Sequence, residues 1–361
     1  MTKASTKQTL TESLIELMEL PGPTGQEEPV LAWCRRRWHE LGGDIESTPI
    51  GNVIARFKGD GPRLLIQGHA DEIGFVVKSI DGRGFIWLTD GQAGAKSFTS
   101  RYPVGQPALV IGRERSIPGL FATATGHILS TRPEDKTRLD ANDFFVDVGA
   151  ESLAEALQLG ISIGDGVIWN PPTRRVGRRI FGKAIDDRVA VALMTHLVEE
   201  VKIADLHYNL TLAATIQEEI GLIGATSLGN RDTFDVAIAI DNGPIADYPG
   251  VDEREMPVRL GRGPTLVYKD SWTHYDRRVI NQLRDVAAAD EIPVQHSIFP
   301  GFGSDGAALI RAGIPTALLA IATRYTHSAF EMADERDIEA ALALLIAFVT
   351  TQPEKLPPGP S

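Results

Sequence analysis

The sequence predicts an α/β protein in which a small β-rich domain is inserted into a larger domain of sheet and helices. Its 361 residues exceed the roughly 100 to 200 residues of a typical single domain. Strand and helix patterns alternate toward both ends of the chain, whereas the middle has short alternating strand patterns separated by Gly and Pro. We therefore expect a larger domain made of residues 1–72 and 171–361 and an inserted β-rich domain at residues 73–170.

The N-terminal residues predict two helices joined by a turn. Apolar residues from Leu10 to Met18 recur at helical spacing, and the segment PGPTG then breaks the pattern. Thr24 and Glu27 have the spacing of a capping box, which predicts that a second helix opens there. The region therefore leads from two helices into the first strands of the sheet.

The remaining elements follow the order expected of an α/β domain with an insertion. The inserted part contains strand patterns such as FVVKSI and GFIWLTD and one helical stretch near residues 153–159. The elements expected in the larger domain are strands at 53–57 and 64–66, an apolar helix after FGKAIDDR, strands LTLAATI and VAIAID, a helix at 279–289, strand TALLAIA and a final helix.

Charge and composition argue against two classes of partner. The formal net charge of -12 and the shortness of the basic runs argue against nucleic-acid binding. No apolar stretch approaches the roughly 20 residues of a membrane span. The N-terminus lacks the apolar segment of a signal peptide, and the single Cys34 cannot form an internal disulfide, so we expect a cytoplasmic protein. Cys34 lies in a helical pattern without a nearby His or Lys, and we expect it to be a buried packing residue.

Polar groups of the kinds that bind metals recur at the ends of predicted strands. A lone His or Asp in a loop is more often a cap or an exposed residue, but five such groups in equivalent places favour a site. The carboxyl ends of parallel strands meet at one edge of a sheet, so these groups should lie together. They are His69 with Asp71, Asp186 with Asp187, Glu218 with Glu219, Asp241, and Thr326-His327-Ser328.

Two His and three acids fit the needs of a hydrolytic pair of metals, which are one shared carboxylate and two further ligands for each ion. Glu218 and Glu219 place two like charges together, which a cation or a shared proton must compensate. One can then bind metal while the other acts as a base, although an acidic helix start is an alternative interpretation. Asp71, two positions beyond His69, can accept the second ring N–H of an imidazole. Asp187 can instead cap the helix that follows.

Six segments around these residues resemble the motifs of the TET and glutamyl aminopeptidase family of two-metal peptidases, in the family's order. They are GHADEIGFVV, FGKAIDDRVAVAL, ATIQEEIGLIGA, AIDNGPIADYPGV, GFGSDGAAL and RYTHSAFE. The likeness covers nearly the whole chain. It implies a central mixed sheet flanked by helices, of the zinc-exopeptidase type, with the inserted β-rich domain serving dimerisation.

The resemblance also implies a role for each site residue. His69 and Asp241 are implied to bind one ion. Glu219 and His327 are implied to bind the other, with Asp186 as the bridge and a cis peptide bond after Asp186. The two divalent ions of each subunit are expected to be zinc or cobalt, with manganese as a third option.

The remaining implied roles concern catalysis and substrate binding. Glu218 is the implied general base and acid, Asp71 supports the site by orienting a ligand, and Asp305 is implied to line the substrate pocket. Phe302 and Ser304 depart from the family motif, which usually has Gly and Thr at these places.

The function implied is the removal of N-terminal amino acids from peptides by metal-activated water and a Glu base. A two-metal deacylase or dipeptidase acting on a small N-acyl or peptide metabolite is the alternative, because the metal site does not specify the acyl group. A non-catalytic assembly protein is a third interpretation. The expected partners are peptides with a free N-terminus and further copies of the chain, as dimers that build hollow twelve-subunit tetrahedra. His127 matches a position that can approach a partner subunit's site, although a surface loop His is the simpler interpretation.

Overall fold

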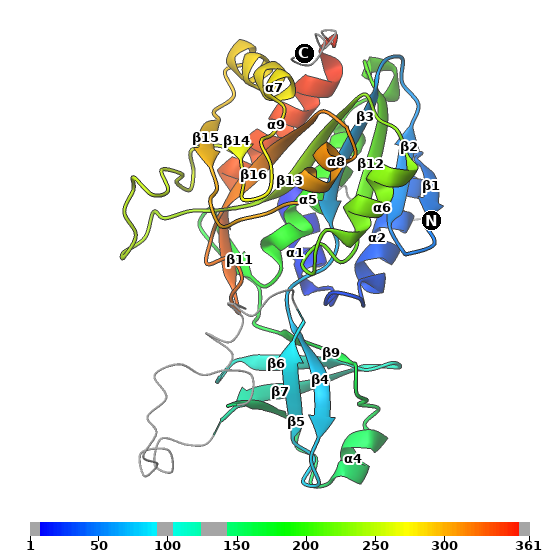
Figure 1. Ribbon diagram of the computed structural model, residues 1–361, viewed down its shortest axis with the longest axis vertical. Coiled ribbons are helices and arrows are strands. Elements are labelled where there is room, and N and C mark those ends of the chain that lie inside the picture. Colours follow the sequence, from blue (N-terminus) through cyan, green and yellow to red (C-terminus); the bar gives the residue numbers. More distant parts are fainter. Residues whose placement is uncertain (1–7, 92–103, 124–142, 354–361) are drawn as a thin grey trace, which may run out of the picture.

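The computed structural model describes residues 8–91, 104–123 and 143–353, and its strands form two sheets (Figure 1). The larger sheet has 11 strands, with the main order β1-β2-β12-β3-β13-β16-β17-β11-β10 and with β14 and β15 joined through β16. Its strands are β1 (Asp44–Ser47), β2 (Val53–Phe57), β3 (Arg63–His69), β10 (Arg174–Val176), β11 (Arg179–Gly182), β12 (Asn209–Thr215), β13 (Val236–Pro244), β14 (Thr265–Lys269), β15 (Gln295–Ile298), β16 (Thr316–Arg324) and β17 (Glu331–Asp334).

Six strands of the larger sheet run in one direction, which decides where its loops gather. β12, β3, β13 and β16 are successive parallel neighbours. β11 is antiparallel to β17, which is antiparallel to β16, so β11 shares their direction. β1 shares it as well, because it is antiparallel to β2, which is antiparallel to β12. The mixed α/β sheet expected from the sequence is thereby confirmed, and the carboxyl ends of the six strands face the same edge.

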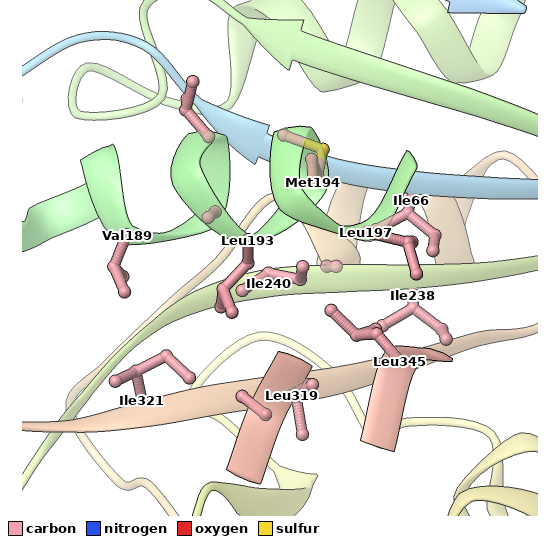
Figure 2. Close-up of a cluster of buried hydrophobic side chains, with 14 of the residues drawn as sticks. Ile66, Val189, Leu193, Met194, Leu197, Ile238, Ile240, Leu319, Ile321 and Leu345 are labelled. Atoms are coloured by element: carbon pink, nitrogen blue, oxygen red, sulfur yellow. The ribbon is translucent and has the colours of Figure 1, made fainter. Parts of the chain in front are cut away.

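Helices cover both faces of this sheet (Figure 1). On one face α5 contacts β3 and β13, and Figure 2 shows its Leu193 and Leu197 against Ile238 and Ile240 of β13. The opposite face packs against α6 and α8. The described helices are α1 (Leu10–Glu19), α2 (Glu28–Glu40), α4 (Leu153–Gln158), α5 (Ile185–Glu200), the 3-10 helix η2 (Ile203–Asp205), α6 (Ile223–Arg231), α7 (Arg277–Ala289), α8 (Gly306–Arg311) and α9 (Glu335–Thr350).

The second sheet closes into a small barrel, drawn below the larger body in Figure 1. The chain leaves the larger sheet after β3 and returns to it at β10. Closure removes the free strand edges that invite aggregation, and an aromatic cluster of Phe75, Phe121, Phe144 and Trp169 fills the interior. The barrel strands, in the order β4-β5-β8-β7-β6-β9, are β4 (Phe75–Ile80), β5 (Ile86–Asp90), β8 (Phe145–Asp147), β7 (Ser116–Ala122), β6 (Pro107–Ile111) and β9 (Gly166–Trp169).

The predicted capping box of the second helix is wrong. α2 begins at Glu28, its N-cap Glu27 has helical backbone angles, and no side chain caps this end. The side chains of Thr24 and Glu27 instead bind groups far along the chain, because tertiary partners are available to them. A capping box is present at the first helix, where Thr9 and Glu12 bind each other's backbone N–H.

Two further expectations can be compared with the structure. Cys34 is a buried free thiol, which confirms its packing role. Within the described ranges, no helix combines the length and the apolar character needed to cross a bilayer.

Candidate metal centre

The co-directional strands bring the predicted polar groups to one edge of the larger sheet. His69 is the last residue of β3 and stands in register with Thr215, the last residue of β12. Glu218 and Glu219 follow β12 after a short turn.

Asp186 and Asp187 follow β11, and His327 follows β16. Asp241 differs from the expectation because it lies inside β13, opposite Ala320 of β16, rather than at a strand end. The peptide bond between Asp186 and Asp187 is cis, as the family resemblance implies.

Within the described ranges, ligand-type atoms gather into three overlapping groups, with the atoms of each group within 4.8 Å of one another. All five predicted metal ligands belong to these groups, and Asp187 and Glu218 join them. The groups are His69 with Asp187 and Asp241, His69 with Glu218 and Glu219, and Asp186 with Glu219 and His327.

Asp186 lies between the two histidines. Its Oδ1 is 3.0 Å from Nε2 of His69, and its Oδ2 is 3.5 Å from Nε2 of His327. Burial opposes ionisation of Asp186, but hydrogen bonds with His327 and His69 outweigh it and hold the carboxyl's pKa below its usual value. Burial lowers the pKa of His327, yet the charges of Glu219 and Asp186 outweigh it and raise that pKa to about 10.

The other acids of the centre are buried close to one another. Burial, and after it the charges of neighbouring acids, raises the pKa of Glu219 to about 7 and the pKa values of Glu218, Asp187 and Asp241 well above their usual range. Oδ1 of Asp187 is buried and has no hydrogen-bond partner among the residues that the structure describes. Carboxylates crowded in this way call for a cation, and a set of imidazole and carboxylate donors fits divalent zinc, cobalt or manganese.

Asp71 joins two parts of the centre. Its Oδ1 accepts the backbone N–H of Glu218 at 3.0 Å, and its Oδ2 accepts that of Glu219 at 3.2 Å and the Thr24 hydroxyl at 2.9 Å. The ring Nδ1 of His69 is nearer to the main-chain oxygen of Asp71, at 3.1 Å, than to its Oδ1, at 3.5 Å. Asp71 therefore fixes the glutamate loop as well as contacting the histidine.

Asp305 lies beside the centre rather than on an open wall. It is buried, its Oδ2 accepts the Thr215 hydroxyl at 2.5 Å, and burial raises its pKa to about 6. Its charge also contributes to the raised pKa of Glu218. His127 falls outside the described residues.

Sequence reasoning assigned no role to Glu331, which the structure places against the centre. Its Oε2 accepts the backbone N–H of Asp186 at 2.9 Å, and burial raises its pKa to about 8. A glutamate four positions after His327 in the RYTHSAFE segment was the available signal, but its contact with a residue 145 positions away was not readable.

Comparisons with known proteins identify relatives that match nearly the whole chain. A family model described as M42 glutamyl aminopeptidase matches residues 51–344. The chain is 28% identical to the glutamyl aminopeptidase of Lactococcus lactis subsp. cremoris (strain MG1363), over 93% of this chain and 94% of that protein.

Two solved structures share the architecture along nearly the whole chain. An aminopeptidase from the archaeon Desulfurococcus kamchatkensis, APDkam598, superposes with a TM-score of 0.87 at 30% identity, covering 94% of each chain. The TET1 peptidase of Pyrococcus horikoshii, which can assemble into a tetrahedron or a large octahedral shell, gives a TM-score of 0.85 at 25% identity, covering 94% of this chain and 99% of that one. Because the family model matches residues 51–344, on a fold whose co-directional strands gather the candidate metal ligands, the chain belongs to the M42 glutamyl aminopeptidase family.

Proposed function

We propose that this chain, a peptidase by its family, removes amino acids from the free N-terminus of peptides with the help of two divalent metal ions. The observation that carries the proposal is the gathering of His69, His327 and five carboxylates into overlapping ligand groups at one sheet edge. When bound, such ions polarise a scissile carbonyl and lower the pKa of a water molecule. Residues 1–72 and 171–361 would then form the catalytic unit.

In this proposal His69 and Asp241 hold one ion. Glu219 and His327 hold the other, and Asp186 is shared between them. Two features support the arrangement: Asp186 contacts both histidines, and Glu219 shares a ligand group with Asp186 and His327. Zinc and cobalt suit this donor set, and manganese is a third candidate.

Glu218 acts as the proton carrier. Its carboxylate accepts a proton from the attacking water and later delivers it to the nitrogen of the leaving amine. Burial raises the pKa of Glu218 well above its usual range, which favours uptake of a proton by its carboxylate. The substrate-binding role proposed for Asp305 is supported only by its place beside the centre, where its charge contributes to the raised pKa of Glu218.

The test is a panel of aminoacyl anilides assayed beside N-acylated amino acids and dipeptides, on metal-stripped protein to which each ion is restored in turn. We expect hydrolysis of the anilides, loss of activity on stripping and recovery with a divalent ion. Cleavage confined to N-acylated amino acids or to dipeptides would assign the chain to the deacylase or dipeptidase alternative. Protein that binds no metal and cleaves nothing would leave only an assembly role.

We also infer that the chain forms homo-oligomers through residues 73–170, with a dimer as the building block of a tetrahedral dodecamer. Exposed apolar side chains on the barrel segment support this, since large apolar groups on a surface often mark an interface; they are Val104, Leu120, Leu153, Leu157 and Ile163. Mass photometry should find dimers and dodecamers, and Leu120→Asp should shift the population toward monomers. A monomer at micromolar concentration would contradict the inference.

The buried free thiol of Cys34 supports a reducing compartment, and we propose the cytoplasm. Fractionation of cells that express the chain, with a periplasmic or secreted marker protein as control, tests this placement.

A further inference from the structure

The loop that carries Glu218 and Glu219 is held by side chains from the N-terminal part of the chain. Its successive backbone N–H groups donate to distant acceptors rather than to a strand or helix ladder. The N–H of Ile216 donates to Oδ1 of Asn52 at 3.1 Å, and that of Gln217 donates to Oε1 of Glu27 at 3.1 Å. The N–H groups of Glu218 and Glu219 donate to the carboxylate of Asp71.

This loop needs outside acceptors because its backbone is irregular. Gln217 has a φ of 52°, in the left-handed region that a residue with a side chain seldom adopts. Buried backbone N–H groups without a partner are costly, so a loop outside regular structure has to find side-chain acceptors. The conformation of residues 216–219 therefore depends on the acceptors that the rest of the chain supplies.

Glu27, like the acceptors Asn52 and Asp71, lies outside the three metal-ligand groups. It is buried, and the same Oε1 also accepts the N–H of Gly25 at 2.8 Å. Its carboxylate is thus fixed by its own turn and reaches across 190 positions of sequence to Gln217. In the same turn, the Thr24 hydroxyl donates to Asp71, so the turn contacts the glutamate loop both directly and through Asp71.

We propose that Glu27 is a positioning residue, whose hydrogen bond to Gln217 holds the backbone so that Glu218 and Glu219 point into the metal centre. The inference rests on the proposed function for the roles of those two glutamates. Without the acceptor, the Gln217 N–H is left unpaired, and its left-handed backbone loses the hydrogen bond that holds it between the residues bound by Asn52 and Asp71. Glu219 then loses its place as a ligand, and Glu218 loses its place beside the reacting atoms.

The loss expected for Glu27→Ala is about 10- to 100-fold in metal affinity or in kcat, which is the usual effect of removing a group that orients a metal ligand. The KM for a peptide substrate should stay close to that of the unmodified protein. Glu27→Gln should restore most of the function, because its amide oxygen can accept the same two N–H groups. Glu27→Asp, which keeps the charge but shortens the reach, should show the same direction of loss as Glu27→Ala.

The matched control is Glu28→Ala, because Glu28 is the next residue and its side chain is 71% exposed and paired with Arg35. For each variant, the experiment measures the dissociation constant for zinc or cobalt by competition with a chelator. It also measures kcat and KM per mole of folded protein, and the thermal midpoint. If Glu27→Ala does not fold, Glu27→Asp replaces it.

The proposal is upheld when Glu27→Ala or Glu27→Asp loses metal affinity or kcat while Glu27→Gln and Glu28→Ala do not. It is overturned if Glu27→Ala lowers only the thermal midpoint and matches Glu28→Ala in both other measurements, since Glu27 would then be merely structural. It is equally overturned if Glu27→Gln is as impaired as Glu27→Ala, since the hydrogen bond would not be the cause. If the unmodified protein cleaves no aminoacyl substrate, the proposed function fails, and the metal dissociation constants still decide the role of Glu27.

Discussion

Replacing Glu218 by Gln separates proton transfer from metal binding. The side chain is only 8% exposed, and the amide has nearly the shape of the carboxyl group. The backbone N–H of residue 218 still donates to Asp71, so the loop should keep its place. What disappears is the proton acceptor. A general base contributes about 10²- to 10⁴-fold to a rate, so kcat should fall by that factor, equivalent to about 3 to 5 kcal/mol.

The assay is steady-state cleavage of an aminoacyl anilide, combined with elemental analysis of the bound metal. Glu218→Gln should keep the metal content and KM of the unmodified protein, because the proposed ligands are untouched. Glu219→Gln is the matched neighbour, and it should lose metal as well as activity. The contrast is informative because Glu218 and Glu219 both belong to a ligand-type group with His69.

The same substitution should raise the stability of the metal-free protein. Burial and the neighbouring acids Asp241 and Glu219 raise the pKa of Glu218 well above its usual range, so ionising it destabilises the fold as pH rises. Gln removes that cost, and metal-stripped Glu218→Gln should therefore melt at a higher temperature than metal-stripped unmodified protein at mildly alkaline pH. Full activity would refute the base assignment. A loss of metal equal to that of Glu219→Gln would instead make Glu218 a ligand.

Three further predictions concern pH, a buried ion pair and the single thiol. In metal-free protein the pKa of Glu219 is raised to about 7 and that of His327 to about 10, so the folded state binds more protons than the unfolded state. The free energy of unfolding should therefore fall as the pH rises from about 5 to about 9. Metal binding requires deprotonated ligands, so the rise in melting temperature on adding zinc should grow over this range. Glu72→Gln should lower the free energy of unfolding by about 3 to 5 kcal/mol in denaturant titrations, because Lys183, 2.9 Å from Glu72 and almost fully buried, loses its partner. Burial raises the pKa of Cys34 to about 12, so a thiol reagent should label it only after unfolding.

Each of these predictions has a contrary outcome. A metal-free stability that rises steadily with pH would contradict the shifted acids and histidine. For the ion pair, Asp235→Asn is the control, because the Arg63–Asp235 pair is half exposed and should contribute about 0 to 1 kcal/mol. Equal losses of unfolding free energy in Glu72→Gln and Asp235→Asn would mean that burial does not increase the cost of removing one partner of an ion pair. Rapid labelling of Cys34 in native protein would show that its helix opens readily.

Local pattern predicted much of the fold because the larger sheet is regular. The strand expected at 53–57 is β2 as observed, and the helix expected at 279–289 differs from α7 only at its first residues. Parallel strands buried on both faces are continuous apolar runs, and polar residues that interrupt such runs at the carboxyl ends stand out. For that reason His69, Glu218, Glu219 and His327 were recognisable as site residues.

Contacts between distant segments were not recognisable from local pattern. The sequence left a helix cap open as one role for Asp187, but its Oδ2 accepts the backbone N–H of His69 at 3.1 Å, and the residue joins a ligand group. Glu331 was given no role, and the structure places it against Asp186. These roles depend on which strands become neighbours, and spacing along the chain does not encode that.

The two Thr-x-x-Glu segments show this division most clearly. Both have the local spacing of a capping box, and the sequence by itself determined that each precedes a helix. At Thr9 and Glu12 the side chains bind their own helix end, which is exposed. At Thr24 and Glu27 the fold brings Asp71 and the Gln217 backbone within reach, and binding these buried groups replaces the cap. Only the tertiary structure decided between a helix cap and a contact with a distant segment. The reason is that a buried hydrogen-bonding group left without a partner costs more free energy than an exposed one.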